Sequence, residues 1–357
     1  MTNLEKTEYD AVFNSPAYNQ HEQVIFCADA ESGLRAIIAI HNSRLGPALG
    51  GYRMWPYKCE NEAITDVLRL SRAMSYKNAL AQLSTGGGKS VIIGDPKSDK
   101  SEALFHAFGR FVESLAGRYI VAEDVGTTVE DMNQIRSQTA HVMGFSAQQG
   151  SSGDPSPVTA YGVFCGLKAA VEYRLGRSEL AGLRVAVQGI GNVGYQLCKY
   201  LHEAGAKLIV SDIQLDAMAR AEADFAAERA PGTEIHDQDV EVFAPCALGA
   251  EINRRTIPRL KAQIVAGAAN NQLERPEDGA DLAARGILYA PDYVINAGGV
   301  INLSYERESG YDRAGAMTHT ARIHDIAMEI FSRAERESRP TSDIADAMAE
   351  ELLTGAR

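Results

Sequence analysis

The turn Gly189-Ile190-Gly191-Asn192-Val193-Gly194 constrains the fold of this chain more than any other stretch does. Its G-x-G-x-x-G pattern is weak evidence alone, because glycine-rich turns are common. The context strengthens it, since an apolar run at 183–188 precedes the turn and a helical pattern at 193–204 follows it. A second apolar run, 207–211, then ends at Asp212, 18 residues after the last glycine. This spacing predicts the first β-α-β unit of a Rossmann sheet.

The same unit predicts which cofactor binds. Glycines let a pyrophosphate approach the backbone at the start of the following helix, where unpaired N–H groups favour negative charge. A carboxylate at Asp212 accepts hydrogen bonds from the ribose hydroxyls of adenosine and repels a 2′-phosphate, so we expect NAD rather than NADP. Later strand–helix units end in small residues and asparagines where a cofactor crosses the sheet. These residues include Ala247, Asn270, Asn271 and Asn296.

At 357 residues the chain is long for one hydrophobic core, so we expect two α/β domains. The clearest interruption is the stretch 150–157, which is rich in Gly, Ser and Pro. We place a substrate-binding and oligomerisation domain at 1–145 and a Rossmann NAD-binding domain at 146–337. The terminal helix, within 338–357, is expected to pack back on the first domain.

Local patterns predict the elements of both domains. Residues 45–53 contain three glycines and are predicted to be an irregular loop on which a ligand lies. Periodicity predicts strands at 22–28, 34–40, 119–122, 240–243, 263–266 and 287–290, and helices at 62–79, 101–115, 127–139, 158–174, 314–337 and 341–353.

Two lysines, Lys77 and Lys89, stand twelve residues apart, and Lys89 follows three glycines. A Walker phosphate loop is disfavoured, because Leu83 stands where that motif needs glycine and a strand-like run, 91–93, follows the lysine. We expect the glycines to leave Lys89 open to a small molecule. Burial and a second lysine lower a lysine pKa, and a base at neutral pH needs a drop of about 3 units. Two surface lysines on a loop are the alternative.

A carboxylate lies just beyond the strand predicted at 119–122, as Glu123-Asp124. Sheets of the α/β class place reactive groups at such strand ends, although a carboxylate there is also a common helix cap. Either Glu123 or Asp124 could therefore lie opposite the two lysines, and position along the chain does not choose between them.

Charge and composition disfavour several other classes. A net charge of −12 and a pI near 5.2 argue against partners such as nucleic acid or an anionic membrane. No apolar run reaches the ~18 residues of a transmembrane helix, and the polar start lacks a signal-peptide core. The five cysteines are scattered without metal-ligand spacing, so we expect a cytoplasmic protein with reduced cysteines and no metal.

Several sequence blocks, in order, resemble the glutamate/leucine/phenylalanine/valine family of amino-acid dehydrogenases, from about His21 almost to the C-terminus. The resemblance implies reversible oxidative deamination of an L-amino acid to a 2-oxo acid and ammonia, with NAD as oxidant. It also implies that Lys89 is the catalytic base, that Lys77 holds the substrate carboxylate and that Asp124 shuttles the amino-group proton. Thr159 and Asn271 would lie near the nicotinamide and the substrate. The blocks are 45–51, Met74 with 76–78, 86–89, 122–128 and 291–299.

The resemblance further implies substrate contacts at Leu49, Gly50, Gly51, Met74, Ala122, Val300 and Leu303. Ala122 and Val300 match the branched-chain type, which predicts L-leucine, L-valine and L-isoleucine as substrates. Leu303, Arg44 and Tyr52 depart from that type, and one methylene shifts selectivity by about 1–3 kcal/mol. The alternatives are an aromatic L-amino acid as substrate, such as phenylalanine, or an inactive NAD-binding sensor. The resemblance also implies a homo-oligomer, often an octamer, so the expected protein partners are copies of this chain.

Overall fold

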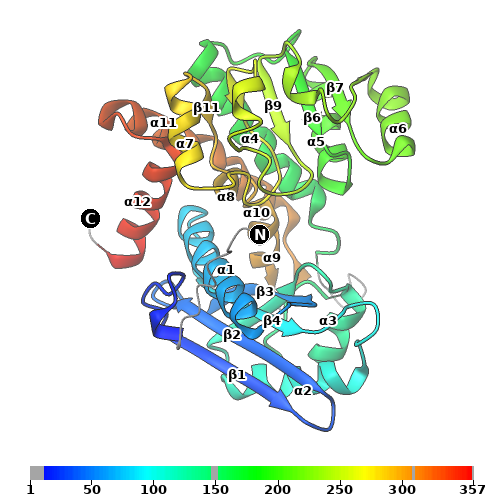
Figure 1. The fold of residues 1–357 in the computed structure, drawn as a ribbon, viewed down its shortest axis with the longest axis vertical. Coiled ribbons are helices and arrows are strands. Elements are labelled where there is room, and N and C mark those ends of the chain that lie inside the picture. The colour runs from blue at the N-terminus through cyan, green and yellow to red at the C-terminus, as the bar shows by residue number, and fades with distance from the viewer. Residues whose placement is uncertain (1–11, 146–151, 308–309, 356–357) are drawn as a thin grey trace, which may run out of the picture. The chain divides into compact units, whose positions relative to one another are not determined.

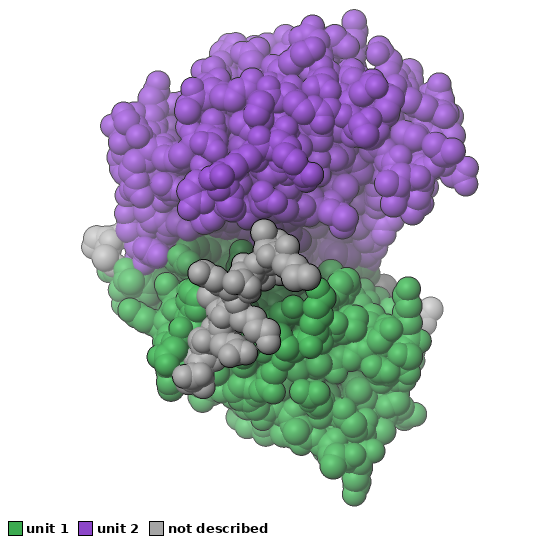
Figure 2. All heavy atoms as spheres, in the orientation of Figure 1, with its two compact units in different colours: residues 1–153, 352–357 green, residues 154–351 purple. Residues whose placement is uncertain are grey.

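A computed structural model describes residues 12–145, 152–307 and 310–355. The chain forms two compact units, coloured separately in Figure 2: residues 1–153 with 352–357, and residues 154–351. The first unit thus extends to Gly153 rather than to the expected residue 145, and the chain rejoins it at Leu352 rather than at 338. Part of the predicted connection, residues 150 and 151, lies outside the described residues.

The first unit is built on a five-stranded sheet in the order β1-β2-β4-β3-β5 (Figure 1). The strands predicted at 22–28 and 34–40 are confirmed as β1 (Gln23–Asp29) and β2 (Leu34–Asn42), which pair antiparallel. Strand β4 (Gly86–Ile93) runs antiparallel to β2. Strand β3 (Ala48–Trp55) lies between β4 and β5 (Tyr119–Glu123) and is parallel to both. The carboxyl ends of these three strands therefore share one edge of the sheet.

Helices cover both faces of this sheet (Figure 1). Helix α1 (Glu60–Leu80) packs on one face through an apolar stripe that includes Val67 and Leu68. Helices α2 (Glu102–Ser114) and α3 (Val129–Arg136) pack on the other face. Their starts follow from sequence, since Ser101 and Thr128 cap the two helices and Thr128 forms a capping box with Asp131. A short 3-10 helix, Val12–Asn14, precedes the sheet.

Two glycine-rich stretches, for which the sequence predicts open or irregular structure, form the central strands instead. Residues 48–53 belong to β3, and the three glycines before Lys89 begin β4. Close packing is the reason, because a Cβ on Gly87 would lie 2.0 Å from the Ser75 backbone nitrogen of α1. A Cβ on Gly50 would lie 1.8 Å from the Gly88 carbonyl oxygen. Glycine lets these elements approach, and it also removes the apolar alternation that marks a strand.

The second unit is built on a six-stranded sheet in the order β11-β10-β9-β6-β7-β8, with parallel pairing throughout. The chain starts in the middle at β6, moves outward through β7 and β8, and then crosses to the other side of β6. This reversal is the topological switch point of a Rossmann sheet, so the predicted fold class is confirmed. The strands are β6 (Arg184–Gln188), β7 (Lys207–Ser211), β8 (Glu228–Arg229), β9 (Val242–Pro245), β10 (Ile264–Val265) and β11 (Leu288–Tyr289).

The helices predicted at 158–174, 193–204 and 341–353 are confirmed to within two residues at each end. The single helix predicted at 314–337 is wrong, because α10 ends at Ala321 and α11 begins at Ile323. The Thr320 hydroxyl donates to the Ala316 carbonyl at 2.7 Å, a side-chain bond that bends helices. The helices are α4 (Ser156–Leu175), α5 (Asn192–Glu203), α6 (Leu215–Phe225), α7 (Glu277–Ala284), α8 (Asp292–Ile295), α9 (Gly298–Ser304), α10 (Arg313–Ala321), α11 (Ile323–Glu337) and α12 (Thr341–Thr354).

Two 3-10 turns and a two-stranded ribbon complete the unit. They are Ile235–Asp237, Ile257–Arg259, and β12 (Glu306–Arg307) with β13 (Gly310–Tyr311). Among the described residues, the helices are all too short or too polar to cross a membrane.

Candidate active site

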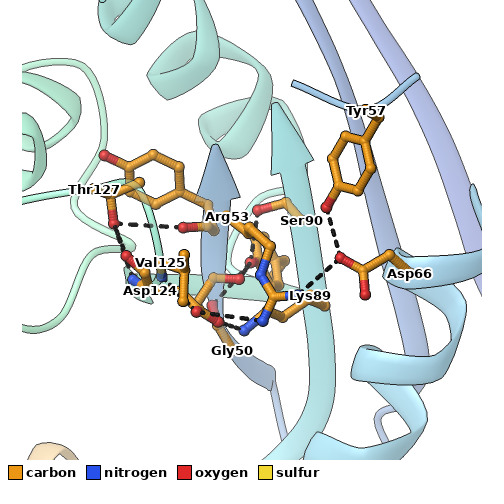
Figure 3. A network of polar contacts seen from close by, with 12 residues as sticks. Gly50, Arg53, Tyr57, Asp66, Lys89, Ser90, Asp124, Val125 and Thr127 are labelled. Atoms are coloured by element: carbon orange, nitrogen blue, oxygen red, sulfur yellow. Dashed lines mark hydrogen bonds and ion pairs between the residues drawn. The ribbon is translucent and has the colours of Figure 1, made fainter. Parts of the chain in front are cut away.

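Buried Lys89 and half-buried Asp124 form a pair at the sheet of the first unit (Figure 3). Lys89 is on β4 and only 5 % exposed, and its Nζ forms an ion pair with Oδ2 of Asp124, just past the end of β5. Of the two carboxylates that position along the chain leaves open, Asp124 reaches the lysine, whereas Glu123 is exposed. The pair brings together the two residues predicted to be catalytic.

Strand alternation decides which way Lys89 points. Its neighbour Ser90 faces the α2 side of the sheet, where its hydroxyl lies 2.9 Å from the hydroxyl of buried Tyr119. Tyr119 in turn donates to the Gly50 carbonyl at 2.8 Å. Lys89 must therefore point to the opposite face, which α1 covers.

The turn after β5 fixes the position of Asp124. Its backbone N–H donates to Thr127 Oγ1 at 2.9 Å, and the Thr127 hydroxyl donates back to the Asp124 carbonyl at 2.6 Å. The N–H of Val125 donates to the Asp124 side chain. Gly51 of β3 leaves space for this turn, because a Cβ there would lie 2.8 Å from the Asp124 Cβ. The carboxylate is thus held by its own turn before any ligand binds.

Sequence reasoning missed two charged residues beside this pair. Arg53 on β3 places Nη1 2.9 Å from Oδ2 of Asp66 on α1, and Nη2 3.7 Å from Oδ1 of Asp124 (Figure 3). The Tyr57 hydroxyl also donates to Asp66 Oδ2, at 2.6 Å. Arg53 stands between Tyr52 and Met54, which are fully buried in the core on the other face, so strand alternation directs the Arg53 side chain toward Lys89.

The surroundings of Lys89 bring its pKa close to neutral pH. Burial, followed by the positive charges of Arg53 and Lys77, lowers the pKa of Lys89 to about 7, and the Asp66 carboxylate acts in the opposite direction. Lys77 is half-buried and lies three helical turns after Asp66, on the same side of α1. A lysine whose pKa lies near neutral pH can both accept and return a proton.

The other residues predicted in the first unit lie around this pair. Leu49 and Gly51 alternate with Gly50 along β3, so they share the face of Lys89, while Gly50 lies on the α2 side. Ala122 of β5 is buried directly opposite Gly51. Met74 is half-buried on α1, about one turn before Lys77. Tyr52 and Arg44, which differ from the branched-chain type, do not lie around the Lys89–Asp124 pair. Tyr52 is in the core, packed on Phe105 and Phe108, and Arg44 is exposed.

In the second unit the glycine turn leaves one position open. A Cβ on Gly191 would meet nothing within 4 Å, whereas one on Gly194 would lie 2.0 Å from the Gly189 carbonyl oxygen. Gly189 has φ +94° and lies against Ala247, whose backbone nitrogen would be 2.7 Å from a Cβ there. Helix α5 begins at Asn192 without a side-chain cap. Its first N–H groups are therefore available to a pyrophosphate.

Further predicted cofactor residues gather around the same edge of this sheet. Asp212 accepts the Ile190 N–H at 2.6 Å through Oδ2 and the Gln214 N–H at 2.8 Å through Oδ1. The side-chain amide of Asn296 donates to Asn270 Oδ1 at 2.8 Å. Val193 is half-buried in the first turn of α5.

The remaining predicted residues also belong to the second unit. Thr159 lies against the start of α9, because a Cβ on Gly299 would lie 2.8 Å from its hydroxyl. Val300 and Leu303 are on α9, buried and half-buried respectively. Asn271 has φ +53°, a conformation that Asn tolerates better than most residues. Within the described ranges, His, Cys, Asp and Glu form no cluster of three that could hold a metal ion.

An open glycine turn on a Rossmann sheet, with a lysine–carboxylate pair on a separate α/β unit, is the arrangement typical of nucleotide-dependent dehydrogenases. Family models narrow this class: the Glu/Leu/Phe/Val dehydrogenase dimerisation domain matches residues 21–141, and the Glutamate/Leucine/Phenylalanine/Valine dehydrogenase domain matches 150–214 and 210–349. The chain belongs to the glutamate/leucine/phenylalanine/valine dehydrogenase family, as the sequence blocks predict.

Relatives with known functions cover almost the whole chain. It is 56% identical to leucine dehydrogenase of Geobacillus stearothermophilus, over 94% of this chain and 92% of that protein. It is 47% identical to valine dehydrogenase of Streptomyces virginiae, over 94% of this chain and 95% of that protein. The crystal structure of L-tryptophan dehydrogenase from Nostoc punctiforme superposes with a TM-score of 0.83 at 46% identity, covering 94% of this chain and 96% of that one.

Proposed function

We propose that this chain catalyses the reversible, NAD-dependent oxidative deamination of a branched-chain L-amino acid to the 2-oxo acid and ammonia. L-leucine is the proposed main substrate, with L-valine and L-isoleucine also accepted. The single observation that supports this most is the ion pair of buried Lys89 with Asp124, on the sheet face covered by α1, the helix that carries Lys77. The identity to leucine dehydrogenase supports the choice of amino acid.

The proposed roles follow from the chemistry of each group. Lys77, a half-buried cation, binds the substrate carboxylate. Asp124 accepts a proton from the substrate amino group and returns it in the reverse reaction. Lys89 in its neutral form takes a proton from the water that attacks the imino carbon, and its lowered pKa suits that task. Side-chain contacts are proposed for Leu49, Gly50, Gly51, Met74, Ala122, Asn271, Val300 and Leu303.

NAD is the proposed cofactor, and when bound it supplies the hydride acceptor. The uncapped start of α5 beside Gly191 suits a pyrophosphate, because its N–H groups have no side-chain cap and a Cβ at this position would meet nothing. The Asp212 carboxylate, held by two backbone N–H groups, suits ribose hydroxyls and disfavours a 2′-phosphate. Thr159, Ala247, Asn270 and Asn296 are proposed further contacts.

A substrate and cofactor panel tests this proposal. The purified protein is expected to form NADH from L-leucine with a higher kcat/KM than from L-phenylalanine or L-tryptophan, and NAD to be preferred over NADP. Lys89→Ala is expected to lower kcat by about 10²–10⁴-fold, the usual contribution of a general base. Lys97→Ala, an exposed lysine after the same strand, is the control. A clear preference for an aromatic substrate contradicts the branched-chain assignment, and NAD binding without NADH formation indicates a sensor.

Assembly and location belong to the same proposal. A homo-octamer is proposed for the active form, and the dimerisation domain matched at residues 21–141 supports self-association. Sedimentation of the purified protein tests it, since an octamer of 38.5 kDa chains differs clearly from a dimer. A cytoplasmic location is proposed because all five cysteines are unpaired.

A further inference from the structure

Arg53 and Asp66 lie beside the Lys89–Asp124 pair but have no role in the function proposed above. The Arg53 guanidinium lies between two carboxylates from different elements, 2.9 Å from Asp66 on α1 and 3.7 Å from Asp124 past β5 (Figure 3). Arginine presents several donors in one plane and can reach two carboxylates at once, which the single ammonium of lysine does less well. The guanidinium therefore connects helix α1 to the Asp124 turn.

Stability alone does not explain this placement. The Arg53 and Asp66 side chains are 23% and 27% exposed, and the Nε of Arg53 is buried without an acceptor among the described residues. A buried donor without an acceptor lowers stability. Asp66, by contrast, is well held, since it also accepts from the Tyr57 hydroxyl at 2.6 Å. Asp66 is thus a fixed anchor, and Arg53 is the group that extends from it toward the reactive pair.

We propose that Arg53 is a positioning residue which, anchored by Asp66, holds the Asp124 carboxylate against the Lys89 side chain. This inference rests on the proposed function, because that function makes Lys89 the base and Asp124 its partner. Arg53 acts through these two groups and is not itself proposed to touch the substrate.

The charges around Lys89 make the proposal measurable. The charged groups that face it are Asp124 past β5, Arg53 on β3, and Asp66 and Lys77 on α1. After burial, which is the largest cause, Arg53 and Lys77 lower the pKa of Lys89 and Asp66 raises it. Removing Arg53 and removing Asp66 should therefore shift the titration of Lys89 in opposite directions.

The first measurement is the pH profile of kcat/KM for L-leucine, whose acid limb reports titration of the base in the free enzyme. The substrate amine titrates identically for every variant, so differences belong to the protein. In Arg53→Met the limb should move by about one unit to higher pH, and in Asp66→Asn to lower pH, with kcat reduced in both. Arg53→Lys keeps the charge but bridges the carboxylates poorly, so its limb should stay near that of the wild type while kcat falls.

Arg35→Met is the matched control, because it also removes an arginine of the sheet that pairs with a carboxylate of α1. That pair, with Glu60, is 3.9 Å long and exposed (61% and 54%). Neither the kcat nor the pH profile of Arg35→Met should differ from that of the wild type. Circular dichroism shows whether each variant folds. If Arg53→Met does not fold, Arg53→Lys and Asp66→Asn are used to test the proposal.

A second measurement needs no turnover. The rate at which acetic anhydride labels Lys89, followed by mass spectrometry across pH, reports the same titration. If the wild type oxidises no amino acid, the proposed function fails while the labelling curves still test Arg53. Curves for Arg53→Met and Asp66→Asn that move in the same direction, or that coincide with Arg35→Met, overturn the proposal.

Discussion

At the scale of single residues, Asp212 holds two backbone N–H groups while its charge also bears on the choice of cofactor. Asp212→Asn keeps one side-chain oxygen, so it can retain one of these two bonds, and it removes the charge that repels a 2′-phosphate. We expect the preference for NAD over NADP, measured as the ratio of kcat/KM values, to fall by about tenfold or more. Asp216→Asn, an exposed carboxylate at the start of α6, should leave the ratio unchanged. An unchanged ratio in Asp212→Asn would contradict the assigned role.

Single residues also differ in how far the sequence predicts their surroundings. Lys89, Asp124 and Asp212 stand beside glycines or at strand ends, so local pattern marks them. Arg53 and Asp66 have no such marker, because their meaning comes from a contact between β3 and α1. A residue whose partner lies on another element carries no local signal of that partner.

At the scale of elements, glycine controls how closely α1 lies on β4. In Gly87→Ala the new Cβ would lie 2.0 Å from the Ser75 backbone nitrogen, so helix and strand must separate. We expect a loss of about 1–3 kcal/mol in unfolding free energy, or failure to fold, because the Ser75 backbone nitrogen and Cα, at 2.0 and 2.3 Å, cannot move aside as a flexible side-chain end could. Thermal unfolding of Gly87→Ala and of the wild type measures this loss of stability. Gly232→Ala is the control, since its Cβ would meet only the Ser211 hydroxyl, at 3.6 Å.

The same packing explains why β3 and the start of β4 could not be predicted. Strand prediction depends on alternating apolar side chains, and these segments have lost side chains where α1 and neighbouring strands approach. By contrast, α1, α5 and β6 are regular and periodic, so their positions follow from sequence. The break between α10 and α11 was invisible for a different reason, because it is a single turn residue, Arg322, within one continuous helical pattern.

Two buried histidines beside α1 make the stability of the first unit sensitive to acid. Burial lowers the pKa of His41 to about 3 and also lowers the pKa of His21, and the His41 Nδ1 lies 2.8 Å from the Ser75 hydroxyl. Because the folded chain binds the His41 proton only near pH 3 and the unfolded chain binds it from about pH 6.5 downward, stability present above pH 6.5 is lost as pH falls, and His21 acts in the same direction.

For His41 this loss should amount to about 2–3 kcal/mol between pH 7 and pH 4.5. His41→Gln should be less stable than the wild type at pH 7 but should lose less stability on acidification. Unfolding midpoints of the wild type and His41→Gln, taken across pH at one protein concentration, measure the stability at pH 7 and the loss on acidification. His202→Gln, an exposed histidine of α5, should follow the wild-type pH dependence. A His41→Gln profile parallel to that of the wild type would contradict the assignment.

At the scale of the whole molecule, each unit has its own hydrophobic core, so the two halves of the proposed reaction can be tested one at a time. The proposed pyrophosphate and ribose contacts, the glycine turn and Asp212, all belong to residues 154–351. NAD alone at about 100 times its Kd should stabilise the protein by about 2.7 kcal/mol. Hydrogen exchange should slow most in peptides covering 189–203, where a pyrophosphate would occupy the N–H groups at the start of α5. Asp212→Asn should weaken this protection at equal NAD concentration, and protection that appears only within 12–145 would contradict the assigned cofactor site.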